Sequence, residues 1–261
     1  MTFPDVRPSN TPDVKRWTGI AAINVAVLLI TEFVLHQVVG PRPELDDSDA
    51  LEAFFVAHHN MMLTIVLIDT VLMAAIIVFL AGFRQIITHA RHDLQWIADV
   101  GFGAGLVFVA ITLVGDAMEA GSALDVVGLD PDVSAIRALT EGHAVMFGAT
   151  GCVLLAVISA SSGYVVIASR ALPRWTGVVA WVVAALQIFG LATIFGGTSD
   201  HFWFSSGGVG VTLTATFPWV AWVITVGIVT IQGHSGFRRR PRRTPRNALV
   251  DWVETASAAE L

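Results

Sequence analysis

The hydrophobic positions of this chain fall into six long apolar runs separated by short polar segments. Each run has about 20 residues or more, the length that crosses a hydrocarbon core of about 30 Å as an α-helix. The pattern predicts an all-α integral membrane bundle of six transmembrane helices, forming one domain over residues 17–232 between an N-terminal segment, 1–16, and a basic tail, 233–261. The predicted helices cover residues 18–39, 61–82, 97–119, 139–168, 175–197 and 209–231.

Local signals refine the ends of these helices. Asp49 and Glu52 resemble a capping box, and the apolar spacing that follows predicts a short amphipathic helix on the outer surface before the second run. Asp130 and Pro131 predict that the fourth helix begins in an outer loop. Pro218 predicts a kink in the sixth helix, because proline removes a backbone donor and clashes with the preceding turn.

Two short patterns bear on helix packing. Gly101 and Gly105 form a small-xxx-small pair, which predicts a close helix approach. Arg-Trp-Thr-Gly occurs at residues 16–19 and again at 174–177, each time where an apolar run begins. Arginine and tryptophan favour the membrane interface and threonine can cap a helix, so chemical convergence alone can account for the repeat. An ancient duplication is the alternative.

Composition supports the membrane assignment and excludes two kinds of chemistry. The chain is 54% hydrophobic and 14% charged, against about 25% charged residues in a typical soluble domain. The single cysteine, Cys152, has no partner for thiol–disulfide exchange, and the single lysine, Lys15, precedes the first run, which excludes a retinal Schiff base in the bundle. No cleavable signal peptide is recognisable, so the first run is expected to act as a signal anchor.

The basic residues alternate between loops. The formal net charge is −6, but arginine and lysine concentrate at one end of the predicted helices, whereas acids dominate the other loops, which hold only Arg42 and Arg137. By the positive-inside rule both termini are predicted to be cytoplasmic in a plasma-membrane protein. The basic residues concerned are Lys15, Arg16, Arg84, Arg91, Arg170, Arg174 and the six arginines between 238 and 246.

The tail from residue 237 to 246 is polybasic and next to the membrane, so its predicted partner is anionic lipid. The apolar positions that follow predict a short amphipathic helix lying on the surface, with binding of a protein partner as the alternative. Nothing in the sequence indicates a nucleic-acid partner.

The connection between the fourth and fifth runs carries a resemblance. The residues that carry it are Phe147, Gly163, Tyr164, Ser169, Arg170, Leu172, Pro173, Arg174, Trp175 and Gly177. This stretch resembles a bacterial family of uncharacterised polytopic membrane proteins with a Leu-Pro-Arg-Trp-Leu-Gly run between two late helices. Here Thr176 replaces the second leucine, and the family's Arg-Ser order is reversed at Ser169 and Arg170. The resemblance implies a fold and no particular activity.

Ionisable side chains inside the runs collect near the predicted outer ends of the helices. Asp116, Glu119, Glu141 and Asp200 share this level, Glu32 lies one turn deeper, and Asp69 lies near the middle of the second run. The histidines at this level are His36, His58, His59, His143 and His201. Five helices are therefore predicted to deliver potential ligands to one layer.

Helical spacing predicts which of these side chains share a face. Glu32 and His36 are four residues apart, and Thr112, Asp116 and Glu119 follow one stripe. Glu141 and His143 point in opposite directions, and Glu141 is predicted to pair with Arg137, one turn away.

The second run carries a longer stripe, because His58 and Asp69 share a face three turns apart, about 16 Å by helical rise. A charge at the bilayer centre costs about 2.5 to 3.5 kcal/mol, so Asp69 needs a proton, water or a partner. Gln187, near the middle of the fifth run, is the predicted partner. Two interpretations of Asp69 and Glu32 stay open: a proton-accepting or ligand-binding cavity, and polar pairs that fix helix register.

A metal site at this level would use mixed imidazole and carboxylate ligands, which suit zinc or iron. The candidate ligands are His36, His58, His59, Asp116, Glu119 and His143. No His-Glu-x-x-His motif and no pair of histidines four residues apart accompanies them, so each ligand would come from a different helix. Haem would need facing histidines such as His36 and His143.

The favoured hypothesis is an outward-facing cavity that binds a small or amphipathic ligand, with or without a metal ion. It would be lined by Glu32, His36, His58, Asp69, Asp116, Glu119, His143 and Gln187. The first alternative is a metal-dependent intramembrane lipid hydrolase; His58 and Asp69 resemble the class of alkaline ceramidases and adiponectin receptors, whose late His-x-x-x-His pair is missing here. The second is a non-catalytic accessory or scaffold subunit. The aromatic stretch 200–204 is expected to anchor at the interface or to cover the outer mouth.

Overall fold

The computed structural model describes residues 13–128, 131–197, 202–206 and 208–237, with side chains up to residue 232. Every regular element in these ranges is helical. Six helical segments are long and apolar enough to cross a membrane, as the hydrophobic pattern predicts. They are Val14–Val39, Ser48–Ala90, His92–Asp125, Val133–Ser169, Arg174–Gly196 and Val209–Gln232.

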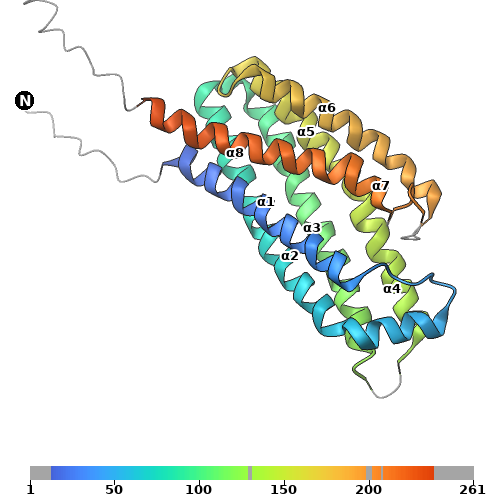
Figure 1. The fold of residues 1–261 in the computed structure, drawn as a ribbon. Coiled ribbons are helices and arrows are strands. Elements are labelled where there is room, and N and C mark those ends of the chain that lie inside the picture. Colours follow the sequence, from blue (N-terminus) through green and yellow to red (C-terminus); the bar gives the residue numbers. More distant parts are fainter. Residues whose placement is uncertain (1–12, 129–130, 198–201, 207, 238–261) are drawn as a thin grey trace, which may run out of the picture.

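The six segments form an elongated bundle in which chain neighbours pack side by side (Figure 1). α1 (Val14–Val39) packs against α2 (Ser48–Ala90) and α8 (Phe217–Phe237), and α2 packs against α3 (Gln95–Asp125), which follows the short η1 (His92–Leu94). α5 (Gly151–Ser169) joins α3 to α6 (Arg174–Gly190), and α6 meets α8. The described chain therefore begins and ends at the same end of the bundle.

The core of the bundle is aromatic, and its outer surface is apolar. Trp222 is fully buried, meets Phe79 and Phe83 edge to face, and donates its indole N–H to the backbone oxygen of Thr176 at 3.2 Å. Large aliphatic side chains stay more than half exposed on the outer faces, among them Leu67 and Val182. Lipid tails would cover such a surface, because they are as apolar as the side chains themselves.

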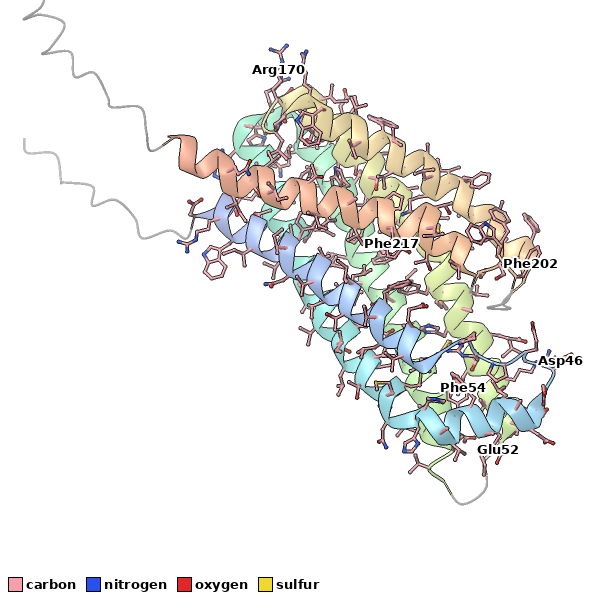
Figure 2. All side chains as sticks on the ribbon, in the orientation of Figure 1. Asp46, Glu52, Phe54, Arg170, Phe202 and Phe217 are labelled. Atoms are coloured by element: carbon pink, nitrogen blue, oxygen red, sulfur yellow. The ribbon has the colours of Figure 1, made fainter. Side chains whose placement is uncertain are left out.

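α2 is one continuous helix of 43 residues that begins at an Asp47 cap, whose carboxylate accepts from the Ala50 N–H at 3.1 Å. The expected amphipathic helix is therefore its first part and no separate element. Its first turns lie across the end of the bundle (Figure 1), and Figure 2 places Glu52 and Phe54 on this segment, far from Arg170 at the other end.

The fourth membrane segment consists of three consecutive helical elements. α4 (Val133–Val145) passes through the π-helical turn η2 (Met146–Thr150) into α5. Its N-cap is Asp132, which accepts from the backbone N–H groups of Ser134 and Ala135. The expected cap, Asp130, lies outside the described residues, as do Asp200, His201 and the predicted helix of the tail.

The predicted disturbance at Pro218 takes the form of a second π-helical turn. α6 continues into η3 (Leu191–Gly196), and the last segment starts with α7 (Val209–Val211) and η4 (Thr212–Thr216) before α8. Pro218 is the second residue of α8, and its ring cannot coexist with an ordinary hydrogen bond to the turn before it. The π-helical turn lies directly before the proline, and the oxygen of Ala215 within it accepts from Gln187.

Small residues allow the close helix contacts that the sequence predicts. A methyl group on Gly101 would lie 2.4 Å from the Ser161 hydroxyl of α5, and one on Gly105 would lie 2.1 Å from a methyl carbon of Leu80. Gly163 and Gly177, both in the run that carries the family resemblance, pack against each other's backbone between α5 and α6. Helix packing therefore accounts for these glycines.

The repeated Arg-Trp-Thr-Gly sequences occupy equivalent environments. In each copy the tryptophan is more than half exposed, the threonine is buried, and the glycine lies against a neighbouring helix. The threonine hydroxyls donate to backbone oxygens in the first turn of α1 and α6. These equivalent environments agree with chemical convergence, and both convergence and duplication stay untested predictions.

Candidate functional site

The ionisable residues inside the bundle gather near the connection between α1 and α2. We call this group the acidic cluster. It contains Glu32 and His36 from α1, Arg42 from the following connection, Asp69 from α2, Asp116 and Glu119 from α3 and His143 from α4. Six of these residues are predicted from the sequence, and Arg42 is not.

Arg42 forms the strongest contact of the acidic cluster. Its guanidinium donates to Glu119 Oε1 at 2.7 Å, and the two side chains are only 13% and 3% exposed. The same guanidinium lies over the ring of Phe55, 5.7 Å from the centroid, where the first part of α2 crosses the end of the bundle. A charged hydrogen bond at this burial is screened little by water.

The backbone around Arg42 explains why a loop residue reaches the interior. Gly40, which ends α1, has a φ of 88°, a conformation that side chains other than glycine rarely adopt. Pro41 and Pro43 flank Arg42 and fix two further φ angles. The chain therefore turns back over the bundle with little freedom, and Arg42 is held toward α3.

His143 connects α4 to the same acid. Its Nδ1 lies 3.0 Å from the backbone oxygen of Gly115 and 3.9 Å from Glu119 Oε2. A carbonyl oxygen can only accept, so Nδ1 carries the proton and donates it. The ring stacks on Phe147 with an angle of 8° between the planes. Gly115 leaves space for this approach, because a methyl group there would lie 3.6 Å from Nδ1.

The deeper part of the acidic cluster is made of carboxyl groups. Asp69 and Asp116 are 2% and 5% exposed, and their carboxyl groups lie close enough to interact directly. Two carboxyl groups can form a hydrogen bond only if one of them carries a proton. The second oxygens, Asp69 Oδ1 and Asp116 Oδ2, are buried without a partner among the described residues. Such a pair has the chemistry to hold a proton between two helices.

Glu32 and His36 link this pair to the surface. They lie one turn apart on α1, with Glu32 Oε1 3.9 Å from His36 Nε2, as the spacing predicts. Glu32 interacts electrostatically with both Asp69 and Asp116, and His36 with Glu119, Arg42 and His143. The His36 side chain is 37% exposed, so it is the most accessible member among those with a stated exposure.

A small cavity lies one helical turn beyond the carboxyl pair. Its volume is about 30 Å3, room for about two water molecules. Leu29, one turn from Glu32, and Leu72, one turn from Asp69, line it together with Phe147, the ring that stacks on His143. The cavity continues the line from His36 through the acids into the middle of the bundle.

Gln187 also lines this cavity, but its partner is not Asp69. It is fully buried, and its amide donates to the oxygen of Ala215 at 2.9 Å, the acceptor in the π-helical turn η4. Its own oxygen Oε1 has no partner among the described residues. The predicted Asp69–Gln187 pair is therefore wrong, because Asp116 on α3 fills that position and the π-helical turn engages the amide.

His58 and His59 do not join the acidic cluster. His58 Nδ1 contacts the backbone oxygen of Phe54 at 2.9 Å and the ring lies against the Phe54 ring, while His59 Nδ1 contacts the oxygen of Val56. Both imidazoles thus bond to their own helix at the end of the bundle. Glu141 pairs with Arg137 at 3.1 Å, as the one-turn spacing predicts.

The described residues contain no group of three histidine, cysteine, aspartate or glutamate side chains arranged to hold a metal ion. The contacts of the predicted ligands give a physical reason. Arg42 already neutralises Glu119, so a metal cation at that oxygen would meet a guanidinium. Nδ1 of His143 is engaged by Gly115, and His58 and His59 bond elsewhere.

The sequence contains one signal for the missed residue. Arg42 is one of two basic residues in the predicted outer loops, and it stands between two prolines directly after a glycine that ends an apolar run. Such a rigid return places its middle residue over the bundle and not in solvent. A lone arginine facing four intramembrane acids is the partner that their burial requires.

Comparisons of the chain with protein-family models, curated proteins and solved structures gave no match. The family resemblance of the run between α5 and α6 stays a prediction. Function is inferred below from the geometry of the acidic cluster.

Proposed function

We propose that this protein is a multi-pass plasma-membrane protein whose acidic cluster binds protons and exchanges them for a small or amphipathic cationic ligand entering from the outer side. Four buried carboxyl groups face a single guanidinium. Uncompensated charge inside a membrane is costly, so protons or another cation must neutralise the remaining acids. This charge balance selects a cation over a neutral or anionic ligand.

The observation that carries the proposal is the direct approach of two buried carboxyl groups, those of Asp69 and Asp116, which can share a proton. The pair stores one proton between two side chains from different helices. When a cation replaces that proton, both carboxylates can bind the cation, and their two unpartnered oxygens supply further acceptors. A pair that only fixed helix register would not need a third acid, Glu32, within electrostatic reach.

The distribution of basic residues supports the orientation. Arg84, Arg91, Arg170 and Arg174 lie at the end of the bundle opposite the acidic cluster, and the positive-inside rule places that end in the cytoplasm. His36 then faces the outer side and forms the entrance. The path runs from His36 past Glu32 to the carboxyl pair and ends at the cavity beside Gln187.

The two alternatives have less support. A metal-dependent hydrolase needs a bound metal, and the predicted ligands already have other partners. A purely structural scaffold would leave the unpartnered oxygens of Asp69 and Asp116 unexplained. Polar groups buried in a membrane protein usually mark a pathway or a binding site.

Infrared titration of the full-length protein in lipid nanodiscs tests the proton site. At neutral pH the wild type should show the C=O band of a protonated, buried carboxyl group, and D69N and D116N should each remove or shift it. The matched control is E141Q, because Glu141 lies in the adjoining α4 with a 43% exposed side chain paired to Arg137. A band that is the same in all four proteins would refute the proton site.

Proton release tests the exchange. Sodium chloride and tetramethylammonium chloride are added separately to weakly buffered protein containing a pH indicator. A cation that enters the acidic cluster should release protons from the wild type and from E141Q, but not from the D69N/D116N double variant. Equal release from the double variant, or none from the wild type with either salt, would refute exchange.

A further inference from the structure

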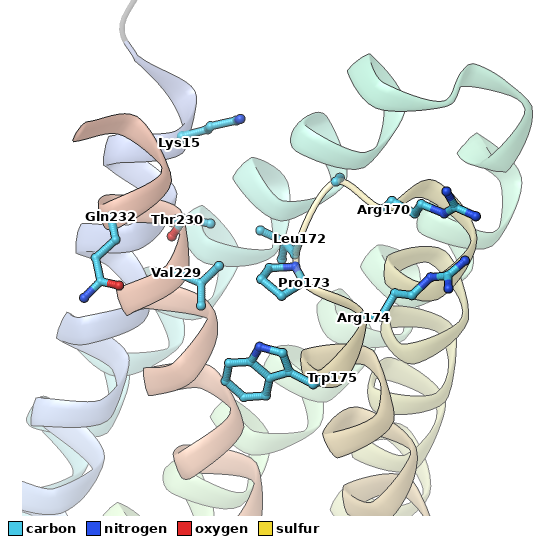
Figure 3. Close-up of a pocket in the computed structure, with 10 residues that line it drawn as sticks. Lys15, Arg170, Leu172, Pro173, Arg174, Trp175, Val229, Thr230 and Gln232 are labelled. Carbon is cyan, nitrogen blue, oxygen red and sulfur yellow. The ribbon is translucent and has the colours of Figure 1, made fainter. Parts of the chain in front are cut away.

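A large hollow lies at the end of the bundle opposite the acidic cluster. Its volume is about 750 Å3, and it is bounded by the start of α1, the end of α8 and the turn between α5 and α6 (Figure 3). This is within the usual range for a site that binds a small molecule, about 300 to 1,000 Å3. Nothing in the proposed proton exchange uses it.

The described lining of this hollow carries only positive charge. Lys15 extends into it from α1, while Arg170 and Arg174 stand on its far rim with their guanidinium groups directed away from Lys15 (Figure 3). The described lining residues include no acid. Two other arginines at this end are neutralised, since Arg84 pairs with Asp99 and Arg91 with Asp93. No ion pair between described residues involves the three cations of the hollow, which therefore offers them to an external anion.

The backbone adds to the positive potential. α6 begins at this hollow after Pro173, and no side chain caps its first turn. The free N–H groups of a helix start attract negative charge. Arg170 has a φ of 57°, the only positive φ of a residue other than glycine in the described ranges. Glycine would adopt this conformation at lower conformational cost. The arginine at this position is therefore less favourable for the backbone than glycine, and it adds a positive charge to the rim.

Apart from Thr230 and Gln232, the rest of the lining is apolar. Leu172 and Pro173 lie in the middle of the hollow, and the ring of Trp175 extends toward Val229 of α8 (Figure 3). Trp175 is 54% exposed, and tryptophan favours the level of the lipid headgroups. A free phosphate ion would use the cations and leave this apolar wall open, whereas a phospholipid would cover both.

We propose that this hollow binds one anionic phospholipid of the cytoplasmic leaflet. The headgroup phosphate lies between Lys15 and the arginines of the α5–α6 turn, and an acyl chain runs past Trp175 and Val229. The predicted orientation places the hollow on the side of the membrane where anionic lipids concentrate. All the described lining residues belong to the bundle.

Lipid-dependent thermal stabilisation of the full-length protein in detergent tests this site. The probes are phosphatidylglycerol, phosphatidylcholine and inorganic phosphate, titrated into wild type, the K15Q/R170Q/R174Q variant and a tail variant, R238Q/R239Q/R240Q. Phosphatidylglycerol should raise the unfolding temperature of the wild type and of the tail variant at the same concentrations. Removing each cation of the hollow should weaken the response about fivefold, from the usual attraction of one basic residue to an anionic surface.

Several outcomes would overturn the proposal. They are an undiminished response of the hollow variant to phosphatidylglycerol, an equal response to phosphatidylcholine, or stabilisation by inorganic phosphate alone. If the triple variant does not fold, lipid retention in native mass spectra of K15Q and R174Q replaces the thermal assay. Both single variants should then retain less phosphatidylglycerol than the wild type, and full retention by both would also overturn the proposal.

Discussion

Removal of the Arg42 guanidinium should destabilise the bundle more than any single exposed charge. In R42M the side-chain stem can still cover Phe55, but Glu119 loses the donor at 2.7 Å while remaining 3% exposed. Removing one partner of a buried ion pair typically costs about 3 to 5 kcal/mol, because the other charge stays buried alone. We expect the free energy of unfolding to fall by an amount in this range.

A double-mutant cycle separates the pair from other effects of the substitution. R42M, E119Q and the double variant are unfolded reversibly in mixed micelles, and the coupling energy is taken from the four stabilities. The coupling should exceed about 2 kcal/mol, since neutral hydrogen bonds between membrane helices average only about 0.6 kcal/mol. The control cycle uses R137Q and E141Q, whose side chains are 51% and 43% exposed, and should give less than about 1 kcal/mol.

A coupling below about 0.6 kcal/mol for Arg42 and Glu119 would refute the reasoning. It would mean that water or lipid headgroups solvate the pair, and the acids of the acidic cluster would then need no internal cation. Equal couplings in the two cycles would lead to the same conclusion.

Three further predictions concern packing, polarity and topology. G163A should lower the free energy of unfolding by about 1 to 3 kcal/mol, because the new methyl group would lie 2.9 Å from the Gly177 backbone oxygen. In the same unfolding assay G103A should be neutral or stabilising, because no atom lies within 4 Å of its new methyl group. Q187L should change stability by less than about 1 kcal/mol, since the lost bond to Ala215 is offset by removing a buried oxygen without a partner; a loss above about 2 kcal/mol would contradict this. Cys152 is buried, so in whole cells a membrane-impermeant maleimide should label S48C and leave A90C unlabelled, and the opposite result would reverse the predicted orientation.

Much of the fold follows from sequence because membrane spanning imposes simple lengths and spacings. The six apolar runs all become helical segments, and the one-turn pairs Glu32–His36 and Arg137–Glu141 form as expected. The continuity of α2 is also predictable from the sequence, since residues 48–81 contain neither proline nor glycine. Its first turns were assigned to a separate helix because only the later part is apolar throughout.

The site was predictable in part, for a physical reason. Spacing within one helix fixes which residues share a face, and this placed Asp116 with Glu119 correctly. It does not fix the rotation of one helix against another, which decided that Asp69 meets Asp116 and not Gln187. The π-helical turn η2 also alters rotation, and no residue pattern in the sequence predicts it, whereas η4 directly precedes Pro218.

The π-helical turn η2 has a consequence for how the outer half of the fourth segment is aligned. A π turn holds one more residue than an α turn, so everything on its α4 side is rotated by about 100° relative to a regular helix. The additional residue thus sets the rotation of α4 relative to α5. With it, α5 packs against α3 and α6 while the imidazole of His143 reaches the backbone oxygen of Gly115. Deleting one residue within 146–150 should convert the π-helical turn into a regular α-helical turn. The imidazole of His143 would then rotate away from Gly115 and Glu119, although no residue that contacts Glu119 is changed.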